Sequence, residues 1–284
     1  MEGRAGAASV AGMSTQTPIG ELIRDWRQRR RLTQMDLAYD AEISPKHLSF
    51  IETGRSKPSR QMVLHLAEQM DVPLREQNAM LVAAGFAPVF PERGLDAPDL
   101  AAARRAIDLI LKGHEPFPAL AVDRHWNLVT ANAAITPFLL ADVELLTPPV
   151  NVLRLTLHPK GLAPRITNLT EWRGHLLDRL RRQIDATADA GLQALYDELK
   201  AYPAPPAAVG APHGQDLGGV AVPMRLQTDH GTMAFISTVT VFGTPTDVTL
   251  SELAMETFFP ADDFTAKALI SLAADRQKEA EKAA

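Results

Sequence analysis

The sequence predicts an α+β protein of two domains, an all-helical domain followed by a domain of antiparallel sheet and helices. The length of 284 residues favours more than one core. Residues 33–59 hold two short helix patterns that begin at Thr33 and Ser44, residue types that cap helices. Residues 220–227 and 232–242 alternate around a turn that contains Gly231, which is typical of a β-hairpin.

The first domain is predicted at residues 18–84 and contains five helices. Thr33 and Asp36 can form a capping box, and Ser44 precedes Pro45, a residue well tolerated at the first position of a helix. The expected helices are 19–32, the two short helices capped by Thr33 and Ser44, one that begins after Ser59, and 74–84.

The second short helix, residues 44–52, should have one buried and one exposed face. Leu48 and Ile51 lie three residues apart and should both face inward. Phe50 lies about 100° around the helix axis from Ile51, which favours exposure over a place in the core. A major groove accepts a helix with one exposed face, so this helix is predicted to read DNA. The residues on its outer face are Pro45, Lys46, Ser49 and Phe50, with His47 at the margin.

The motifs TQxxLA at 33–38, LSxxExG at 48–54 and PS at 58–59 resemble the helix-turn-helix of the XRE family. The resemblance covers residues 19–70 and implies the five-helix fold of the lambda-type repressors. It further implies that Arg27 pairs with Glu52, and that Gln34 bonds a phosphate and supports the recognition helix. Pro45 departs from the glutamine often found there, so base preferences of that class do not transfer.

Side-chain chemistry suggests how this helix would contact a double-stranded DNA operator. Lys46 can donate to guanine O6 and N7, Ser49 can serve either base edge, and Phe50 can pack on a thymine methyl. The candidates for base contact are Pro45, Lys46, Ser49 and Phe50. The candidates for contact with the DNA backbone are Gln34, His47, Thr53, Arg55 and Lys57.

The charge distribution supports a nucleic-acid partner at one end only. The formal net charge is −5, yet residues 18–60 hold nine Lys or Arg against six Asp or Glu, a net charge of +3. The run Arg29, Arg30 and Arg31 is either a solvated helix face or a contact to DNA phosphates.

Composition excludes several classes of protein. The chain has no cysteine, which excludes disulfides, a thiolate zinc site and a Cys nucleophile. No apolar run approaches ~20 residues and no charged-then-apolar leader is present, so we expect a soluble, cytoplasmic protein without a membrane partner. Residues 1–17 are expected to be disordered, and residues 276–284 to form a charged tail.

Residues 85–97 form the predicted linker, and residues 98–275 form the second domain. Between 85 and 98 there are three prolines and two glycines. A helix at 98–113 should be followed by strands at 119–122 and 126–130, and by a short helix that Asn132 opens toward residue 140. Asn168 and Glu171 form a capping-box-like start for a long helix. The remaining expected elements are a helix at 192–201, a loop at 202–219, the hairpin, a strand at 248–254 and a terminal helix. Both faces of 232–242 are partly apolar, so both are expected to be covered.

The segments 121–134, 151–164, 168–180 and 256–265 resemble the ligand-binding domain of MmyB-like transcription regulators. The resemblance implies a PAS-like sheet that encloses an apolar pocket, with a fatty-acid-like ligand. We expect the polar anchor to be Arg154, His158 or Arg173, because an acidic headgroup needs a cation or a donor. The candidate ligand-binding residues are Phe138, Leu153, Arg154, Leu157, His158, Trp172, Arg173, Leu176, Phe235 and Val239.

No motif of an enzyme, metal site or cofactor site is present. The eight histidines include no HExxH, and GxSxG, a phosphate-binding glycine loop and a dinucleotide fingerprint are missing. We therefore expect no catalytic residue, no metal and no cofactor. The predicted function is a ligand-responsive DNA-binding regulator that acts as a homodimer on a palindromic operator. Two alternatives stay open: an enzymatic second domain, and a helix-turn-helix that binds a protein.

Overall fold

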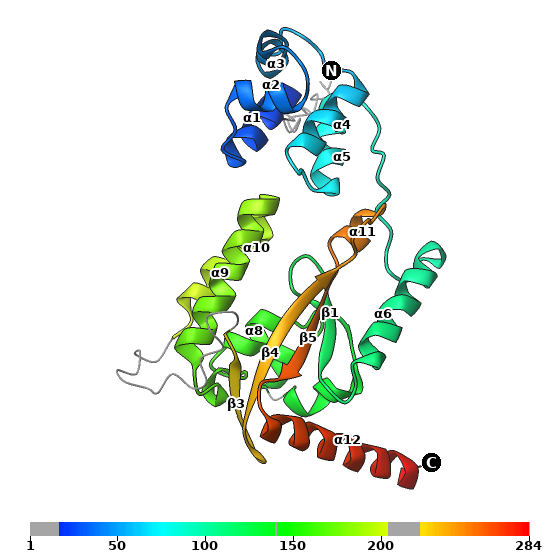
Figure 1. Ribbon diagram of the computed structural model, residues 1–284, viewed down its shortest axis with the longest axis vertical. Helices are drawn as coiled ribbons and strands as arrows, with labels where there is room; N and C mark the ends of the chain where they lie inside the picture. Colours follow the sequence, from blue (N-terminus) through cyan, green and yellow to red (C-terminus); the bar gives the residue numbers. More distant parts are fainter. Residues whose placement is uncertain (1–16, 140, 204–221, 284) are drawn as a thin grey trace, which may run out of the picture. The chain divides into compact units, whose positions relative to one another are not determined.

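The computed structural model describes residues 17–139, 141–203 and 222–283 (Figure 1). The chain divides into two compact units, Met1–Phe90 and Pro91–Ala284. The first is helical, and the second holds a five-stranded antiparallel sheet with helices, so the α+β class is confirmed. The expectations for residues 1–16, and for most of the loop at 202–219, lie outside the described residues.

Local capping defines the helices of the first unit. Thr33 Oγ1 accepts from the Asp36 N–H at 3.1 Å, and Asp36 Oδ2 accepts from the Thr33 N–H at 2.8 Å, so the capping box is confirmed. Ser44 and Ser59 cap the next two helices with one bond each, accepting from the N–H groups of His47 and Met62. The five helices are α1 (Ile19–Arg29), α2 (Gln34–Asp40), α3 (Pro45–Glu52), α4 (Arg60–Gln69) and α5 (Leu74–Ala83).

Helices α1 and α3 approach each other closely at Gly20. A Cβ at this position would lie 2.6 Å from the backbone oxygens of both Ile51 and Glu52, which leaves no room for a side chain. The core that these helices enclose is made of fully or nearly fully buried apolar side chains: Ile23, Trp26, Leu37, Leu48, Ile51, Val63, Leu66, Met70, Met80 and Leu81. Helix α3 is therefore held against α1 by close backbone approach as well as by core packing.

The five strands of the second unit form the order β2-β1-β5-β4-β3, with each neighbouring pair antiparallel. Their bounds are β1 (Ala119–Val122), β2 (Leu128–Ala131), β3 (Met224–Thr228), β4 (Gly231–Val241) and β5 (Ala254–Pro260). Both predicted hairpins are present. Asp123 Oδ1 accepts from the N–H groups of His125 and Asn127 in the first turn, and Gly231 takes a φ of 118° in the second.

Helices cover both faces of the sheet (Figure 1). Helix α6 (Ala101–Gly113), which follows the 3₁₀ turn η1 (Pro98–Leu100), packs Ile107 and Leu111 on one face. The other face carries the larger core. The elements around that core are η2 (Ala133–Phe138), α7 (Val143–Leu146), α8 (Val152–Leu157), η3 (Ala163–Arg165), α9 (Leu169–Thr187) and α10 (Ala190–Ala201), with α12 (Asp263–Ala283) packed on β4 and β5.

The strand predicted at 248–254 is wrong. Val248–Ser251 is instead the short helix α11, because buried Asp247 caps it by accepting from the Thr249 N–H at 2.9 Å. The last strand, β5, begins at Ala254 and ends at Pro260. A local cap has therefore overridden the strand preference of a Val-Thr pair.

Two asparagines that were expected to start helices act at longer range. Asn168 makes no cap: its Oδ1 accepts from the Arg225 N–H and its Nδ2 donates to the Pro223 carbonyl and to Glu171. Asn132 likewise joins β1 to the end of α6, and the short element after it is the 3₁₀ helix η2. The capping-box interpretation of residues 168–171 is thus wrong, although α9 begins at Leu169.

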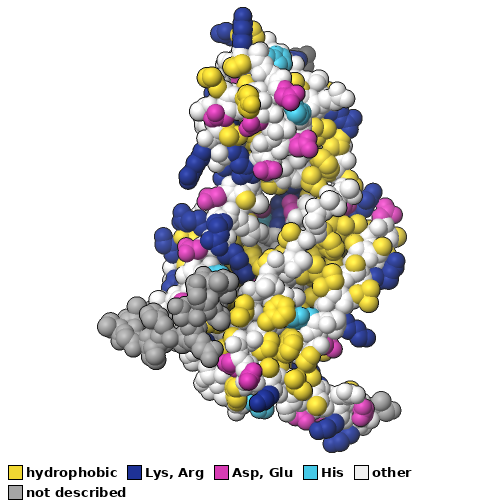
Figure 2. Space-filling view, viewed as in Figure 1, with side chains coloured by type: hydrophobic (Ala, Val, Ile, Leu, Met, Phe, Trp, Pro, Cys, Tyr) yellow, Lys and Arg dark blue, Asp and Glu magenta, His cyan; other side chains and the backbone are white. Residues whose placement is uncertain are grey.

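The expectation that both faces of strand 232–242 are covered fails in its second half. β3 pairs with β4 only as far as Phe235, so β4 beyond that residue has β5 as its one paired neighbour among the described strands. Val239 and Val241, on the same face as Phe235, are 43% and 59% exposed. Hydrophobic side chains are accordingly visible at the surface beside the strands (Figure 2).

Replacing Gly20 by Ala should destabilise the first unit, because the new methyl group must push α1 away from the α3 backbone. We expect a loss of about 1–3 kcal/mol in the free energy of unfolding, measured by urea denaturation. Gly174→Ala is the matched control, since Gly174 lies within α9 and a Cβ there meets nothing within 4 Å. That change should stabilise by about 0.5–1 kcal/mol. Equal effects at both positions would contradict the close approach.

Candidate functional site

The outer face of α3 carries the residues expected to meet DNA bases. Pro45 and Lys46 are exposed, Ser49 and Phe50 are partly exposed, and Leu48 and Ile51 are fully buried. The Phe50 ring has the Lys46 Nζ 5.7 Å from its centroid, and the Arg55 guanidinium carbon 5.9 Å from it. An apolar ring between two cations can pack on a base while the cations contact anionic or acceptor groups.

A buried ion pair fixes α3 relative to its neighbours. Arg27 donates from Nε to Glu52 Oε1 at 2.7 Å and from Nη2 to Glu52 Oε2 at 3.0 Å, and its Nη1 donates to the Leu32 carbonyl. Gln34 Nε2 donates to Glu52 Oε2 at 2.7 Å. Burial would raise the pKa of Glu52, but the hydrogen bonds from Arg27 and Gln34 outweigh it and lower the pKa. One carboxylate therefore joins α1, α2 and α3.

The other candidates for phosphate contact surround this helix. Arg55 and Lys57 are exposed in the loop that follows Gly54, whose φ is 73°. His47 is half-buried, and the Thr53 hydroxyl donates back to the Ser49 carbonyl at 2.7 Å. In this structure the hydroxyl proton of Thr53 is thus used within the helix.

Within the arginine run, Arg30 has a structural contact that the sequence did not indicate. Its Nε donates to the Met70 carbonyl at 2.6 Å, and its Nη2 donates to the Asp71 carbonyl at 2.8 Å. Its guanidinium also lies 5.1 Å from the centroid of the Trp26 ring. Arg30 therefore satisfies carbonyls at the end of α4, whereas Arg29 and Arg31 are exposed.

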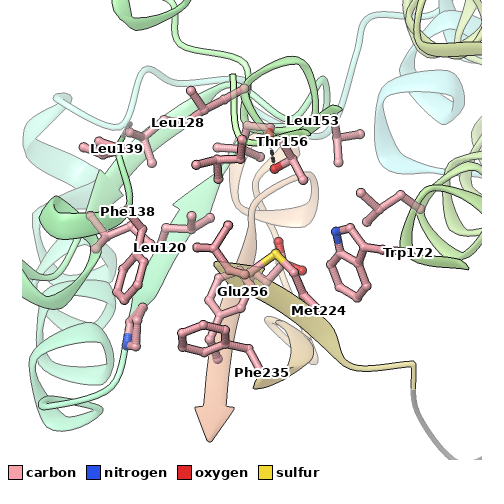
Figure 3. Close-up of a pocket in the computed structure, with 18 of the residues that line it drawn as sticks. Leu120, Leu128, Phe138, Leu139, Leu153, Thr156, Trp172, Met224, Phe235 and Glu256 are labelled. Atoms are coloured by element: carbon pink, nitrogen blue, oxygen red, sulfur yellow. Dashed lines mark hydrogen bonds between the residues drawn. The ribbon is translucent and has the colours of Figure 1, made fainter. Parts of the chain in front are cut away.

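The second unit contains an apolar cavity between the sheet and helices α8 and α9 (Figure 3). Its volume is about 70 Å³, smaller than the long cavity expected from the sequence. Five of the predicted ligand-binding residues line it: Phe138, Leu153, Trp172, Leu176 and Phe235. The remaining lining residues are Pro118, Leu120, Leu128, Ile135, Leu139, Val152, Leu155, Thr156, Leu162, Arg179, Met224, Leu226, Glu256 and Phe258.

The three predicted polar anchors do not line the cavity. Arg154 donates to Glu198 at 2.8 Å, which joins α8 to α10. His158 accepts from the Lys160 N–H through Nδ1, and Arg173 donates to carbonyls at the end of α10. Leu157 is buried in the core without reaching the cavity, and Val239 lies on the uncovered part of β4.

The charged residues that do line the cavity are Arg179 and Glu256, which were not among the residues predicted from the sequence. Arg179 Nη1 lies 2.9 Å from Glu256 Oε1, and its guanidinium carbon is 4.3 Å from the centroid of the Trp126 ring. The signal was present, since Arg179 follows Trp172 and Leu176 at helical spacing. An arginine on an otherwise apolar stripe of a helix needs a buried partner.

Two of the residues that line the cavity each carry a buried donor that has no acceptor among the described residues. They are Trp172 Nε1 and Arg179 Nη2, both inaccessible to solvent. The third polar lining residue, Thr156, donates its hydroxyl to the Val152 carbonyl at 2.7 Å. The cavity therefore combines an apolar wall with hydrogen-bonding capacity that the protein itself does not use.

Across residues 17–139, 141–203 and 222–283, no group of three or more His, Cys, Asp or Glu could hold a metal ion. No helix in the described part of the chain is long and apolar enough to cross a membrane.

Comparisons with known proteins match both units. Residues 18–80 match a family described as a helix-turn-helix domain. Residues 103–272 match the MmyB-like transcription regulator ligand binding domain. Multiprotein-bridging factor 1 of Candida albicans is 32% identical over 69 residues, which are 24% of this chain and 46% of that protein. The protein of the same name from Debaryomyces hansenii is 35% identical over 60 residues, 21% of this chain and 40% of that protein. The chain thus spans less than half the length of these relatives.

The lowered pKa of Glu52 predicts a pH-dependent contribution to stability. Because the folded-state pKa lies below the ordinary value of 4.5, the stabilisation is present above pH 4.5 and is lost as the pH falls through the folded-state pKa. Glu52→Gln should lower the free energy of unfolding by about 3–5 kcal/mol at neutral pH. The difference from wild type should narrow below pH 4.5 in urea denaturation.

Glu68→Gln, on the exposed side of α4, is the control and should leave the stability close to wild type at every pH. A constant difference between wild type and Glu52→Gln across the acidic range would show that the charge of Glu52 does not stabilise the fold.

Proposed function

Because the chain belongs to the MmyB-like transcription regulators, with a helix-turn-helix unit and a ligand-binding domain, we propose that an apolar small molecule in its second unit controls how its first unit binds an operator. The observation that supports the ligand part of this proposal is the apolar cavity on the larger-core face of the sheet. The exposed face of α3 supports the proposal that the first unit binds DNA.

In the proposed complex, α3 lies in the major groove. Lys46 reads guanine, Ser49 serves a base edge, and Phe50 packs on a thymine methyl, with Pro45 beside them. Arg55 and Lys57 contact phosphates together with Gln34, His47 and Thr53, which sets the register without reading sequence. Support for Gln34 comes from its bond to Glu52, which holds the amide at the start of α2. A single unit of this kind reads a half-site, so we propose a homodimer on a palindromic operator.

The ligand proposed here is a molecule with an apolar chain, such as an acyl chain. A 150 Å³ cavity is known to hold benzene in another protein, so a cavity of about 70 Å³ must widen before it accepts a longer molecule. A ligand that binds only the widened form shifts the equilibrium between two conformations by its differential affinity. The small volume therefore supports a ligand that changes the protein, instead of one that fills a ready-made pocket.

A second candidate function is protein binding by the first unit. Both relatives carry the name multiprotein-bridging factor. Helix α2 also exposes Met35 and Tyr39, one turn apart, at 71% and 84%. Large apolar side chains at such exposure are common in interaction surfaces, although scattered ones occur on any surface.

Lys46→Ala should weaken binding to the specific operator by about 1–3 kcal/mol and relax the base choice at one position. Arg55→Ala should weaken binding to specific and random duplexes alike, and reduce the slope of log affinity against log salt by about one. Fluorescence anisotropy at several salt concentrations measures both. If Lys46→Ala loses the same affinity for the specific and the random duplex, Lys46 does not contact a base. If the wild-type protein does not distinguish the two duplexes, the protein-binding candidate gains support.

Apolar ligands of increasing chain length should stabilise the delipidated protein. The gain follows RT ln(1 + [L]/Kd), about 2.7 kcal/mol at a concentration of 100 Kd, because the ligand binds only the folded form. We would supply straight chains as both acids and methyl esters, and follow Tm and operator affinity. A dependence on chain length in both quantities is expected.

Leu176→Phe narrows the cavity and should reduce these shifts, whereas Val239→Phe changes a residue outside the lining and should not. If neither acids nor esters of any length move Tm or operator affinity, the apolar-ligand proposal fails.

A further inference from the structure

The hydrogen-bond donors and charges of the residues that line the cavity limit which polar group a ligand can carry there. This inference rests on the proposed function, because it requires that the cavity binds an apolar molecule. Two lining residues each carry a donor that has no acceptor among the described residues: Trp172 Nε1, in a residue that is 2% exposed, and Arg179 Nη2. A buried donor without an acceptor is destabilising, so a ligand oxygen that accepts from either group gains affinity.

The charges of the lining residues cancel. Among the described lining residues, Arg179 and Glu256 are the ones that carry a formal charge, and they face each other at 2.9 Å. His175 stacks on Trp172 with ring centroids 5.3 Å apart. Burial lowers the pKa of His175, and the positive charges of Arg179 and Arg182 lower it further, so this imidazole is neutral at neutral pH. The site therefore has donors to offer but no uncompensated positive charge.

A carboxylate is poorly matched to such a site. It would bring a second negative charge beside Glu256 in an apolar enclosure, where an unbalanced charge is strongly unfavourable. A neutral carbonyl oxygen accepts the same hydrogen bonds and leaves the Arg179–Glu256 pair intact. We propose that the ligand is an uncharged apolar molecule with a carbonyl group, such as an ester, ketone, lactone or amide, whose oxygen accepts from Trp172 Nε1 or Arg179 Nη2.

The test compares three probes with matched chains on the delipidated full-length protein: octanoate, methyl octanoate and octane. At neutral pH, methyl octanoate should bind at least about 10-fold more tightly than octanoate, and more tightly than octane, as measured by thermal shift and titration calorimetry. The affinity of the ester should not change between mildly acidic and neutral pH. The affinity of the acid should fall as the pH rises, because only its protonated form suits the site.

Two variants connect this preference to named groups. Trp172→Phe removes the indole donor and keeps an aromatic ring, so the ester should lose affinity about 5–10-fold while octane is unaffected. Glu256→Gln leaves Arg179 with an uncompensated charge and should reverse the preference in favour of octanoate. Thr156→Val is the matched control: its hydroxyl already donates to the Val152 carbonyl, so its loss should not change the ratio of ester to octane affinity.

The outcomes separate the two proposals. Tighter binding of octanoate than of its ester by wild type would overturn the neutral-ligand inference and leave the apolar-ligand function standing. An unchanged ratio of ester to octane affinity in Trp172→Phe would overturn the role of the indole. Because Trp172→Phe changes no charge, this variant keeps the test available if Glu256→Gln does not fold. Absence of any shift with all three probes would overturn both proposals.

Discussion

A buried carboxylate held by an arginine stands at the centre of each unit. In the first unit, Glu52 at the end of α3 receives Arg27 from α1 and Gln34 from α2. The backbone of α1 meets that of α3 at Gly20, so the two helices cannot slide without breaking the pair. The direction of α3, and with it the set of side chains available to DNA, depends on this one carboxylate.

The ion pair in the second unit joins the same two residue types, arginine and glutamate, but not all of its donors have acceptors. Every nitrogen of the Arg27 guanidinium has an acceptor, in Glu52 or the Leu32 carbonyl. Arg179 donates Nη1 to Glu256 and leaves Nη2 without an acceptor, on the wall of a cavity. A completed network rigidifies a fold, whereas an incomplete one retains binding capacity. This difference distinguishes the structural pair of the first unit from the pair at the proposed ligand site more clearly than the residue types do.

How far the sequence predicted the structure depends on the range of the interactions. The helices around Thr33, Ser44 and Ser59 were predicted well because their caps involve neighbours three residues away. Asn132 and Asn168 carried the same local signal, but their side chains bond to distant strands and loops, which sequence spacing does not reveal. The strand predicted at 248–254 failed for the opposite reason, since a local signal was overlooked: Asp247 caps α11 by accepting from the Thr249 N–H, and β5 begins only at Ala254.

The ligand site was predictable only in part because an apolar cavity wall and an apolar core use the same residues. Phe138 and Leu157 are both buried and both apolar, yet one lines the cavity and the other does not. Position along a strand decided another case: Val239 shares a face of β4 with Phe235, but Phe235 is 2% exposed and Val239 is 43% exposed. Arg154 and Arg173, which were predicted to anchor the ligand, instead donate hydrogen bonds to groups on α10. No local sequence pattern indicates these distant partners.

The cavity's walls indicate which part of the second unit has to move when it widens. One wall is the sheet, whose strands are joined by ladders of hydrogen bonds and cannot separate cheaply. The opposite wall is formed largely by helices, so widening displaces them, and α9 carries both unsatisfied donors. Helix α9 is tied to the β1–β2 turn, where Trp126 donates to Gln183, and to the end of α10 through Arg173. A ligand that hydrogen-bonds to Trp172 or Arg179 is therefore expected to displace α9. A displacement of α9 would also move the β1–β2 turn and α10, which are hydrogen-bonded to it. Under the proposed function, occupancy of this small cavity would be converted into a change at the surface of the second unit, as control of a DNA-binding unit requires.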